Sequence, residues 1–93
     1  MPRPCKRRRV RGRPSAYYFK PAGVPKMELE ESIMSVEEFE AIRLKDHLSL
    51  DQSECALKME ISQPTFHRLL CSARKKVATA IVNGEAIRID KSN

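Results

Sequence analysis

The chain has 93 residues, enough for one domain with a modest core but not for a deep substrate cavity as well. Its 18 Lys and Arg residues outnumber its 12 Asp and Glu residues, which favours polyanionic partners. No apolar run approaches the roughly 20 residues that cross a bilayer, and no apolar stretch follows the N-terminal charges as in a secretory signal. We therefore expect a cytoplasmic protein.

The positive charge is concentrated at the N-terminus. Residues 1–26 contain nine basic residues and no acidic residue, whereas residues 27–93 contain nine basic residues and all twelve acidic ones. Residues 1–14 also contain three prolines and little that can be buried, so we expect them to be disordered alone and to order on a partner. The sequence thus divides into a basic, largely flexible arm and connector over 1–26 and a folded domain over 27–93.

The arm contains Arg11-Gly12-Arg13-Pro14, which resembles the core of an AT-hook. In such a hook, glycine lets the backbone lie flat in a narrow minor groove while the arginines reach along its floor. The alternative is a basic tail that contacts phosphates without sequence preference, with an affinity that falls steeply with salt. Under either alternative, the predicted DNA-contacting residues of the arm are Lys6, Arg7, Arg8, Arg9, Arg11, Gly12 and Arg13.

Segments before and after the predicted helices carry weak strand patterns. The aromatic run 16–20 is a strand or an anchor, and apolar residues alternate with glutamates over 27–30. Near the C-terminus, Ile87 and Ile89 flank Arg88 in the same way. A lone strand leaves its backbone groups unpaired, so we expect a short two-stranded pairing with 16–20 or 27–30, from the same chain or a second one.

The first helix is marked by a capping box, because Ser35 is followed three residues later by Glu38. The box predicts a helix over 35–47, with apolar residues such as Val36 and Ile42 facing the core. The acidic residues between them are expected on a solvated face, in ion pairs with nearby basic residues. These acidic residues are Glu37, Glu38 and Glu40.

Two further helices follow. The second begins at Asp51 or Gln52, and Ser62 caps the third, where Pro64 is tolerated because first-turn N–H groups have no intrahelical partner. The Asn-Gly pair at 83–84 is a stop signal, so the third helix is predicted to be about 31 Å long.

Residues 52–70 have the spacing of a helix-turn-helix motif. Ala56 faces the other helix of the pair, where a larger side chain would push the two apart, and Ile61 fills the corner beneath the turn. Phe66 attaches the recognition helix to the core. Glu60 occupies the turn position that usually holds glycine, because the residue there is left-handed, which costs other residues about 1–2 kcal/mol.

The face of the third helix opposite these core residues is polar at its N-terminal end, which is the end that enters a major groove in this motif. Arginine pairs with guanine and glutamine with adenine, while a capping hydroxyl and free first-turn N–H groups suit a phosphate. The predicted recognition residues are Ser62, Gln63, Thr65, His67 and Arg68. The basic residues further along the helix are predicted to contact the DNA backbone or, alternatively, to lie on a solvated face: Arg74, Lys75 and Lys76.

The three cysteines (Cys5, Cys55 and Cys71) lie far apart and form no CxxC pair, which is typical of reduced thiols in a cytosolic protein. His67 and Cys71 supply two ligands from one helix face, but no second pair is visible. We therefore expect neither metal nor cofactor. We also expect no enzymatic activity, since the sequence has no nucleophile–base pairing, no glycine-rich phosphate loop and no carboxylate dyad with a pocket.

Several segments together resemble one family. They are Met-Pro-Arg-Pro at the start, Arg-Gly-Arg-Pro at 11–14, Phe-Lys-Pro-Ala-Gly at 19–23, Ser-Val-Glu-Glu-Phe-Glu-Ala-Ile-Arg-Leu at 35–44 and Ser-Gln-Pro-Thr-Phe-His-Arg-Leu-Leu at 62–70. The family is uncharacterised protein family 0251, small prokaryotic proteins predicted to bind DNA. The chain departs from its pattern at Cys5, Cys55 and Glu60. Residues 51–77 are also similar to region four of bacterial sigma factors, a likeness of fold that gives no target sequence.

We therefore expect a mainly α-helical fold: a three-helix domain of helix-turn-helix type, with a basic arm and a short two-stranded β pairing. The expected function is sequence-specific binding of double-stranded DNA in transcriptional regulation, at the nucleoid, and as a homodimer if two half-sites are read. Two alternatives stay open. One is an RNA- or ribosome-binding protein whose arm folds on contact, and the other is a sigma-like adaptor that docks on RNA polymerase.

Overall fold

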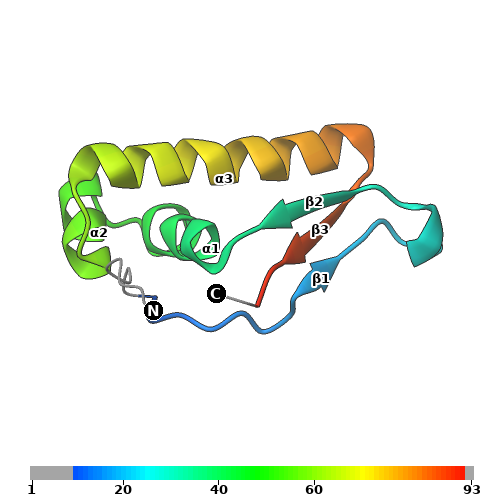
Figure 1. The fold of residues 1–93 in the computed structure, drawn as a ribbon, viewed down its shortest axis with the longest axis horizontal. Coiled ribbons are helices and arrows are strands. Elements are labelled where there is room, and N and C mark those ends of the chain that lie inside the picture. Colours follow the sequence, from blue (N-terminus) through cyan, green and yellow to red (C-terminus); the bar gives the residue numbers. More distant parts are fainter. Residues whose placement is uncertain (1–9, 92–93) are drawn as a thin grey trace, which may run out of the picture.

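The structure, a computed structural model, describes residues 10–91. Its longest element is α3 (Gln63–Asn83), which runs along one side of the molecule (Figure 1). The shorter helices lie beneath one end of α3, and a small three-stranded sheet lies beneath the other. The fold is mainly α-helical with a small sheet, as the sequence predicts. Over the described range, no helix is both long and apolar enough to cross a membrane.

The first helix, α1 (Val36–Ile42), begins at the predicted capping box. Ser35 Oγ accepts a hydrogen bond from the Glu38 N–H at 3.1 Å, and the Glu38 side chain accepts one from the Ser35 N–H at 2.9 Å. The helix continues as a π-helical turn, η2 (Arg43–His47), in which the main-chain bonds span one residue more than in an α-helix. The predicted helix over 35–47 is therefore confirmed.

The second and third helices are held by side-chain caps. The Asp51 carboxylate caps α2 (Gln52–Met59) by accepting a hydrogen bond of 2.8 Å from the main-chain N–H three residues on. Ser62 caps α3 in the same way at 3.2 Å, and α3 ends where Gly84 turns to a φ of 69°. The predicted start of α2 and the predicted start and end of α3 are confirmed.

The turn between α2 and α3 contains the left-handed residue that the sequence predicts. Glu60 has a φ of 59° and a ψ of 44°, although its Cβ disfavours this conformation. The next residue, Ile61, donates its N–H to the Ala56 carbonyl oxygen at 3.1 Å and packs against the core. The turn therefore closes the end of α2 and redirects the chain into α3.

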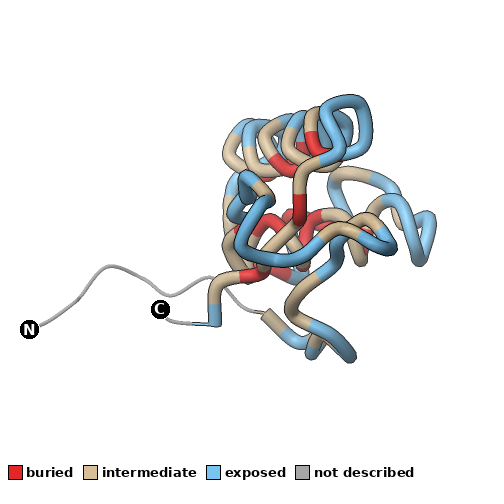
Figure 2. The backbone as a smooth tube through the Cα atoms, turned by 90° about the vertical axis from the view of Figure 1, so that its right-hand side faces the viewer, coloured by how far each residue is buried: buried red, intermediate tan, exposed pale blue. Residues whose placement is uncertain are grey.

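The main core lies where the end of α1, η2, α2 and the first half of α3 meet. Buried segments form the interior of the molecule in Figure 2. The buried residues of this cluster are Ala41, Leu44, Cys55, Ala56, Met59, Phe66 and Leu70. Phe66 is fully buried, and burying a side chain of this size contributes about 1.5–3 kcal/mol. The predicted packing roles of Ala56 and Phe66 are confirmed.

The sheet joins the two ends of the described chain. Its central strand is β3 (Ala86–Ile89), which pairs antiparallel with β1 (Tyr18–Phe19) and parallel with β2 (Glu31–Met34). β1 lies inside the predicted segment 16–20. The sheet thus has one strand more than the expected pairing, and β2 leads directly into the capping box of α1.

The predicted strand pattern over 27–30 is wrong. Lys26–Glu28 forms a short 3-10 helix, η1, which follows Pro25. The Glu28 N–H donates to the Pro25 carbonyl oxygen at 3.0 Å, so local bonds engage N–H groups that a strand would offer to a neighbour. β2 therefore begins only at Glu31, although the Glu30 carbonyl oxygen already accepts a hydrogen bond of 2.9 Å from the Ala86 N–H of β3.

Candidate nucleic-acid interface

The start of α3 presents most of the predicted recognition residues on one surface. Ser62, Gln63, His67 and Arg68 are exposed, whereas Thr65 is half-buried. Thr65 Oγ1 accepts hydrogen bonds from Ser62 Oγ at 2.9 Å and from Arg68 Nη2 at 3.3 Å. Thr65 therefore holds the Ser62 and Arg68 side chains in place. The other four predicted residues are exposed to a ligand.

The outward face of α3 is larger than the sequence analysis indicated. Because the helix repeats every 3.6 residues, Pro64, Cys71 and Lys75 fall on the same side as Arg68, and all four are exposed. Phe66 lies on the opposite side, in the core. Pro64 and Cys71 were missed as members of this face, although their spacing of four and three residues from Arg68 is the signal that finds them.

His67 lies between the two helices. Gln52 Nε2, from the first residue of α2, is 3.4 Å from His67 Nδ1, and Cys71 Sγ is 3.4 Å from His67 Nε2. The start of α2 therefore borders the recognition face, and the sequence analysis missed Gln52 as part of it. Within residues 10–91, no group of three or more His, Cys, Asp or Glu side chains is placed to hold a metal ion.

The three basic residues further along α3 do not form one patch, because successive helical residues point about 100° apart. Arg74 forms a two-pronged ion pair with Asp46, with distances of 2.6 and 3.0 Å. Lys76 Nζ lies 2.8 Å from Glu38 Oε1. Only Lys75 is exposed and has no ion pair with another described residue. The structure therefore places the three residues on different sides of α3, and their contact with the DNA backbone stays a prediction.

Glu38 was predicted to lie on a solvated face, but this prediction is wrong. The residue is only 5% exposed. Burial alone would raise its pKa, but hydrogen bonds from Lys76, Ser72 and the Ser35 N–H outweigh burial and lower the pKa overall. The carboxylate is therefore ionised and ties the start of α1 to the middle of α3. The helical pattern failed here because Lys76 lies 38 residues away in the sequence.

Glu40, also predicted on the solvated face, is 1% exposed. Its carboxylate accepts hydrogen bonds from the Arg11 and Gly12 N–H groups, each at 3.1 Å, and from the Arg43 guanidinium at 2.8 and 3.0 Å. Burial opposes ionisation, but the bonds from Arg43 and from the two N–H groups lower the pKa of Glu40 overall. Arg11 and Gly12, which fall in the segment expected to be disordered, are therefore bound to α1 in the structure.

Gly12 has a structural reason for being glycine. A Cβ at this position would lie 2.0 Å from Arg43 Nε, so a larger residue would displace the Arg43 side chain. The Gly12 backbone lies against α1, while Arg11 and Arg13 are exposed. The other predicted arm residues lie outside the described range: Lys6, Arg7, Arg8 and Arg9.

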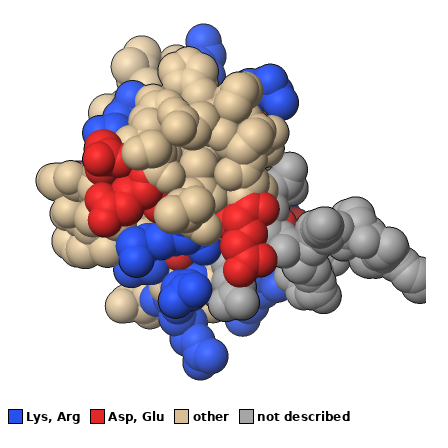
Figure 3. Space-filling view, turned by 90° about the vertical axis from the view of Figure 1, so that its left-hand side faces the viewer, with Lys and Arg blue, Asp and Glu red and all other residues tan. Residues whose placement is uncertain are grey.

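The end of the molecule that carries α2 and the start of α3 has mixed charge. Figure 3 shows acidic and basic side chains interspersed on this face. The concentrated positive charge of the chain lies in the N-terminal sequence, where residues 1–26 hold nine basic and no acidic residues.

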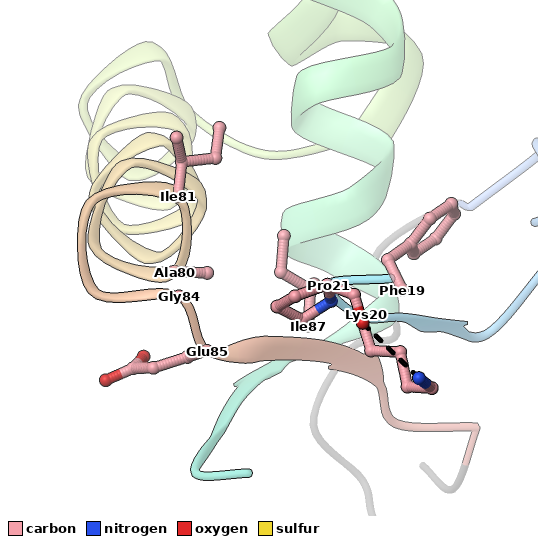
Figure 4. A pocket seen from close by; sticks show the side chains of 8 residues that line it. All are labelled: Phe19, Lys20, Pro21, Ala80, Ile81, Gly84, Glu85 and Ile87. Carbon is pink, nitrogen blue, oxygen red and sulfur yellow. Dashed lines mark hydrogen bonds between the residues drawn. The ribbon is translucent and has the colours of Figure 1, made fainter. Parts of the chain in front are cut away.

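A second surface lies at the opposite end of α3. There, an apolar hollow of about 340 Å³ opens between α3 and β1 (Figure 4). Phe19 and Ile81 line it and are 52% and 72% exposed, and Ile87 of β3 lies between them. This hollow is separate from the recognition face at Gln63.

Comparison with known proteins identifies the family. The family described as "Protein of unknown function DUF134" matches residues 1–93. The chain belongs to this family. A UPF0251 protein of Caldanaerobacter subterraneus subsp. tengcongensis is 57% identical over 93 residues, which are 100% of this chain and 79% of the relative.

Further UPF0251 relatives come from other organisms. Those of Moorella thermoacetica and Dehalococcoides mccartyi are 59% and 57% identical over 90 residues, covering 97% of this chain and 60% and 77% of the relatives. The predicted membership in family 0251 is thus confirmed. No solved structure matches the chain.

Proposed function

We propose that this member of the DUF134 family binds double-stranded DNA sequence-specifically and acts as a transcriptional regulator, with α2, the turn and α3 as a helix-turn-helix. The observation that carries the proposal is the orientation of α3. The left-handed Glu60 and the Ser62 cap aim α3 so that Phe66 is buried while Gln63 and Arg68 remain exposed. Placing the N-terminal half of such a helix in a major groove is how this motif reads bases.

Each exposed side chain has a chemical role in this proposal. Arg68 has the donors for guanine O6 and N7, and Gln63 suits adenine N6 and N7. The Ser62 hydroxyl and the Gln63 N–H at the start of α3 suit a phosphate, whereas Pro64 has no N–H and the Thr65 N–H bonds to Ser62 Oγ. Lys75 extends the contact along the DNA backbone, and the basic N-terminal segment adds sequence-independent phosphate contacts.

The test is selection of bound sequences from a random duplex library at about 150 mM salt, where long-range charge is screened as in cells. We expect a defined motif, and Arg68→Ala should weaken its binding by about 5- to 150-fold and relax one base position, as loss of a 1–3 kcal/mol contact predicts. The matched control is Arg88→Ala, an equally charged site on β3. It should leave the motif unchanged.

Two outcomes would contradict the proposal. The first is a library without enrichment, and the second is a motif that Arg68→Ala leaves intact. Equal affinity for structured RNA would favour the RNA- or ribosome-binding alternative, and binding to RNA polymerase alone would favour the adaptor. A palindromic motif, with light scattering that gives twice the chain mass, would support homodimerisation.

A further inference from the structure

The N-terminal segment is attached to the body through one buried carboxylate. Glu40 is 1% exposed and accepts four hydrogen bonds, two from the Arg43 guanidinium and two from the main-chain N–H groups of Arg11 and Gly12. The last two bonds join residues 29 and 28 positions apart in the sequence. We call this arrangement the Glu40 clamp.

The clamp determines where the segment lies. A buried carboxylate is costly unless its oxygens are fully hydrogen-bonded, so losing the two N–H donors would leave Glu40 poorly satisfied. Among residues 10–14, which belong to no helix or strand, Val10, Gly12 and Pro14 are half-buried and Arg11 and Arg13 are exposed. The two bonds to Glu40 are the hydrogen bonds that tie this stretch to α1. Close contact between Gly12 and Arg43 further limits the segment to this path.

The clamp also determines where the basic residues begin. The described chain starts, at residue 10, toward the end of the molecule that carries α2 (Figure 1). The ten residues before Arg11 reach at most about 35 Å from this point. Without the clamp, the next main-chain attachment is the Tyr17 carbonyl oxygen, which accepts a hydrogen bond of 2.9 Å from the Ile89 N–H, and the longer tether lowers the local concentration of the basic residues about 2-fold.

We infer that Glu40, with Arg43, is a positioning residue that delivers the basic segment around Arg7–Arg9 to the DNA flanking the site read by α3, on the side of α2. This inference rests on the DNA binding proposed above. In the resulting complex, α3 reads the major groove, and the anchored segment contacts neighbouring phosphates or the adjacent minor groove. Glu40 touches no DNA and acts only through the segment it holds.

The chain offers a matched pair of variants for the test. Glu40→Gln and Glu38→Gln each remove the charge of a buried carboxylate on α1, but only Glu40 bonds to the N-terminal segment. Each is measured by hydroxyl-radical footprinting and by duplex affinity on the selected motif. Each is also combined with replacement of arginines 7–9 by glutamine, which leaves the clamp residues in place.

We expect Glu40→Gln to weaken duplex binding at least about 2-fold and to remove the flanking protection while the motif at α3 stays protected. Glu38→Gln should keep the flanking protection. In the chain without arginines 7–9, Glu40→Gln should have no further effect on affinity. Unchanged flanking protection in Glu40→Gln, or the same loss of affinity with and without these arginines, would overturn the inference.

Amide hydrogen exchange in the free protein tests the clamp separately from DNA binding. The Gly12 N–H should be protected in the wild type and in Glu38→Gln, and should exchange faster in Glu40→Gln. Fast exchange in the wild type overturns the clamp itself. A protected Gly12 in a chain that binds no duplex instead overturns the proposed function, and with it the positioning role.

Discussion

Replacing Glu60 by glycine should give a more stable fold than replacing it by alanine. Glu60 has a φ of 59° and a ψ of 44°, a left-handed conformation that costs a residue with a Cβ about 1–2 kcal/mol. Glycine avoids this cost but loses about 0.4–1 kcal/mol through the greater freedom of the unfolded chain. The difference predicts that Glu60→Gly is about 1 kcal/mol more stable than Glu60→Ala.

Glu60→Ala is the appropriate reference because it also lacks the interactions of the glutamate side chain, so the comparison isolates the backbone. Urea unfolding followed by circular dichroism gives both free energies of unfolding. For a domain of this size, 1 kcal/mol corresponds to a rise in melting temperature of about 4–8 °C. The exposed helical residue Ala78 provides the opposite control, since Ala78→Gly should lower stability by about 1 kcal/mol.

Equal stability of the glycine and alanine variants at position 60 would refute the reasoning. It would mean that the turn between α2 and α3 relaxes to another conformation when the side chain is shortened. The orientation of α3, which depends on this turn, would then be less firmly fixed than the caps at Asp51 and Ser62 indicate.

Three other predictions follow from burial and charge. Phe66→Ala should lower the free energy of unfolding by about 3–5 kcal/mol, whereas Leu57→Ala, at a residue 77% exposed, should change it by less than about 0.5 kcal/mol in the same urea assay. Because the pKa values of Glu38 and Glu40 are lowered in the folded chain, their stabilisation is present above their ordinary value of 4.5 and lost as pH falls through the lowered values. Unfolding free energies across an acid series should show this loss, and constant values would contradict it. In duplex binding, glutamine at positions 7–9 should reduce the slope of log affinity against log salt by about 3, and an unchanged slope would exclude these arginines from the phosphate contact.

The helices could be predicted from the sequence because their signals are local. Ser35 and Ser62 each cap a main-chain N–H three residues on, and Gly84 ends α3 with a positive φ. Each signal involves residues within one helical turn, so side-chain chemistry and spacing are sufficient to recognise it. The same holds for the left-handed turn at Glu60.

The sheet could be predicted only in part, because its register joins distant residues. Ile87 and Ile89 identified β3, and the aromatic run contained β1, but β2 pairs with β3 across more than 50 residues. Alternation over 27–30 favoured the wrong partner, since it contains no information about the 3-10 helix that follows Pro25. Non-local pairing and local turns compete for the same N–H groups, and only the folded chain shows the outcome.

The candidate site, too, could be predicted only in part from the sequence. The exposure of Gln63 and Arg68 follows from the periodicity of α3, which also places Phe66 in the core. The ion pairs of Arg74 and Lys76 do not follow from this periodicity, because their acidic partners lie on other helices. Charges counted along a sequence therefore overstate the cations that are available to DNA.

The two buried glutamates of α1 show why polar residues are the hardest to place from sequence. A carboxylate is buried only when the folded chain supplies enough donors, and those donors come from α3 for Glu38 and from the N-terminal segment for Glu40. Main-chain N–H groups have no sequence signature, so no pattern could reveal the second set. The register of the segment in the Glu40 clamp is set instead by Gly12, since a Cβ at this position would lie 2.0 Å from Arg43 Nε. Gly12 therefore fixes the point from which the basic residues start.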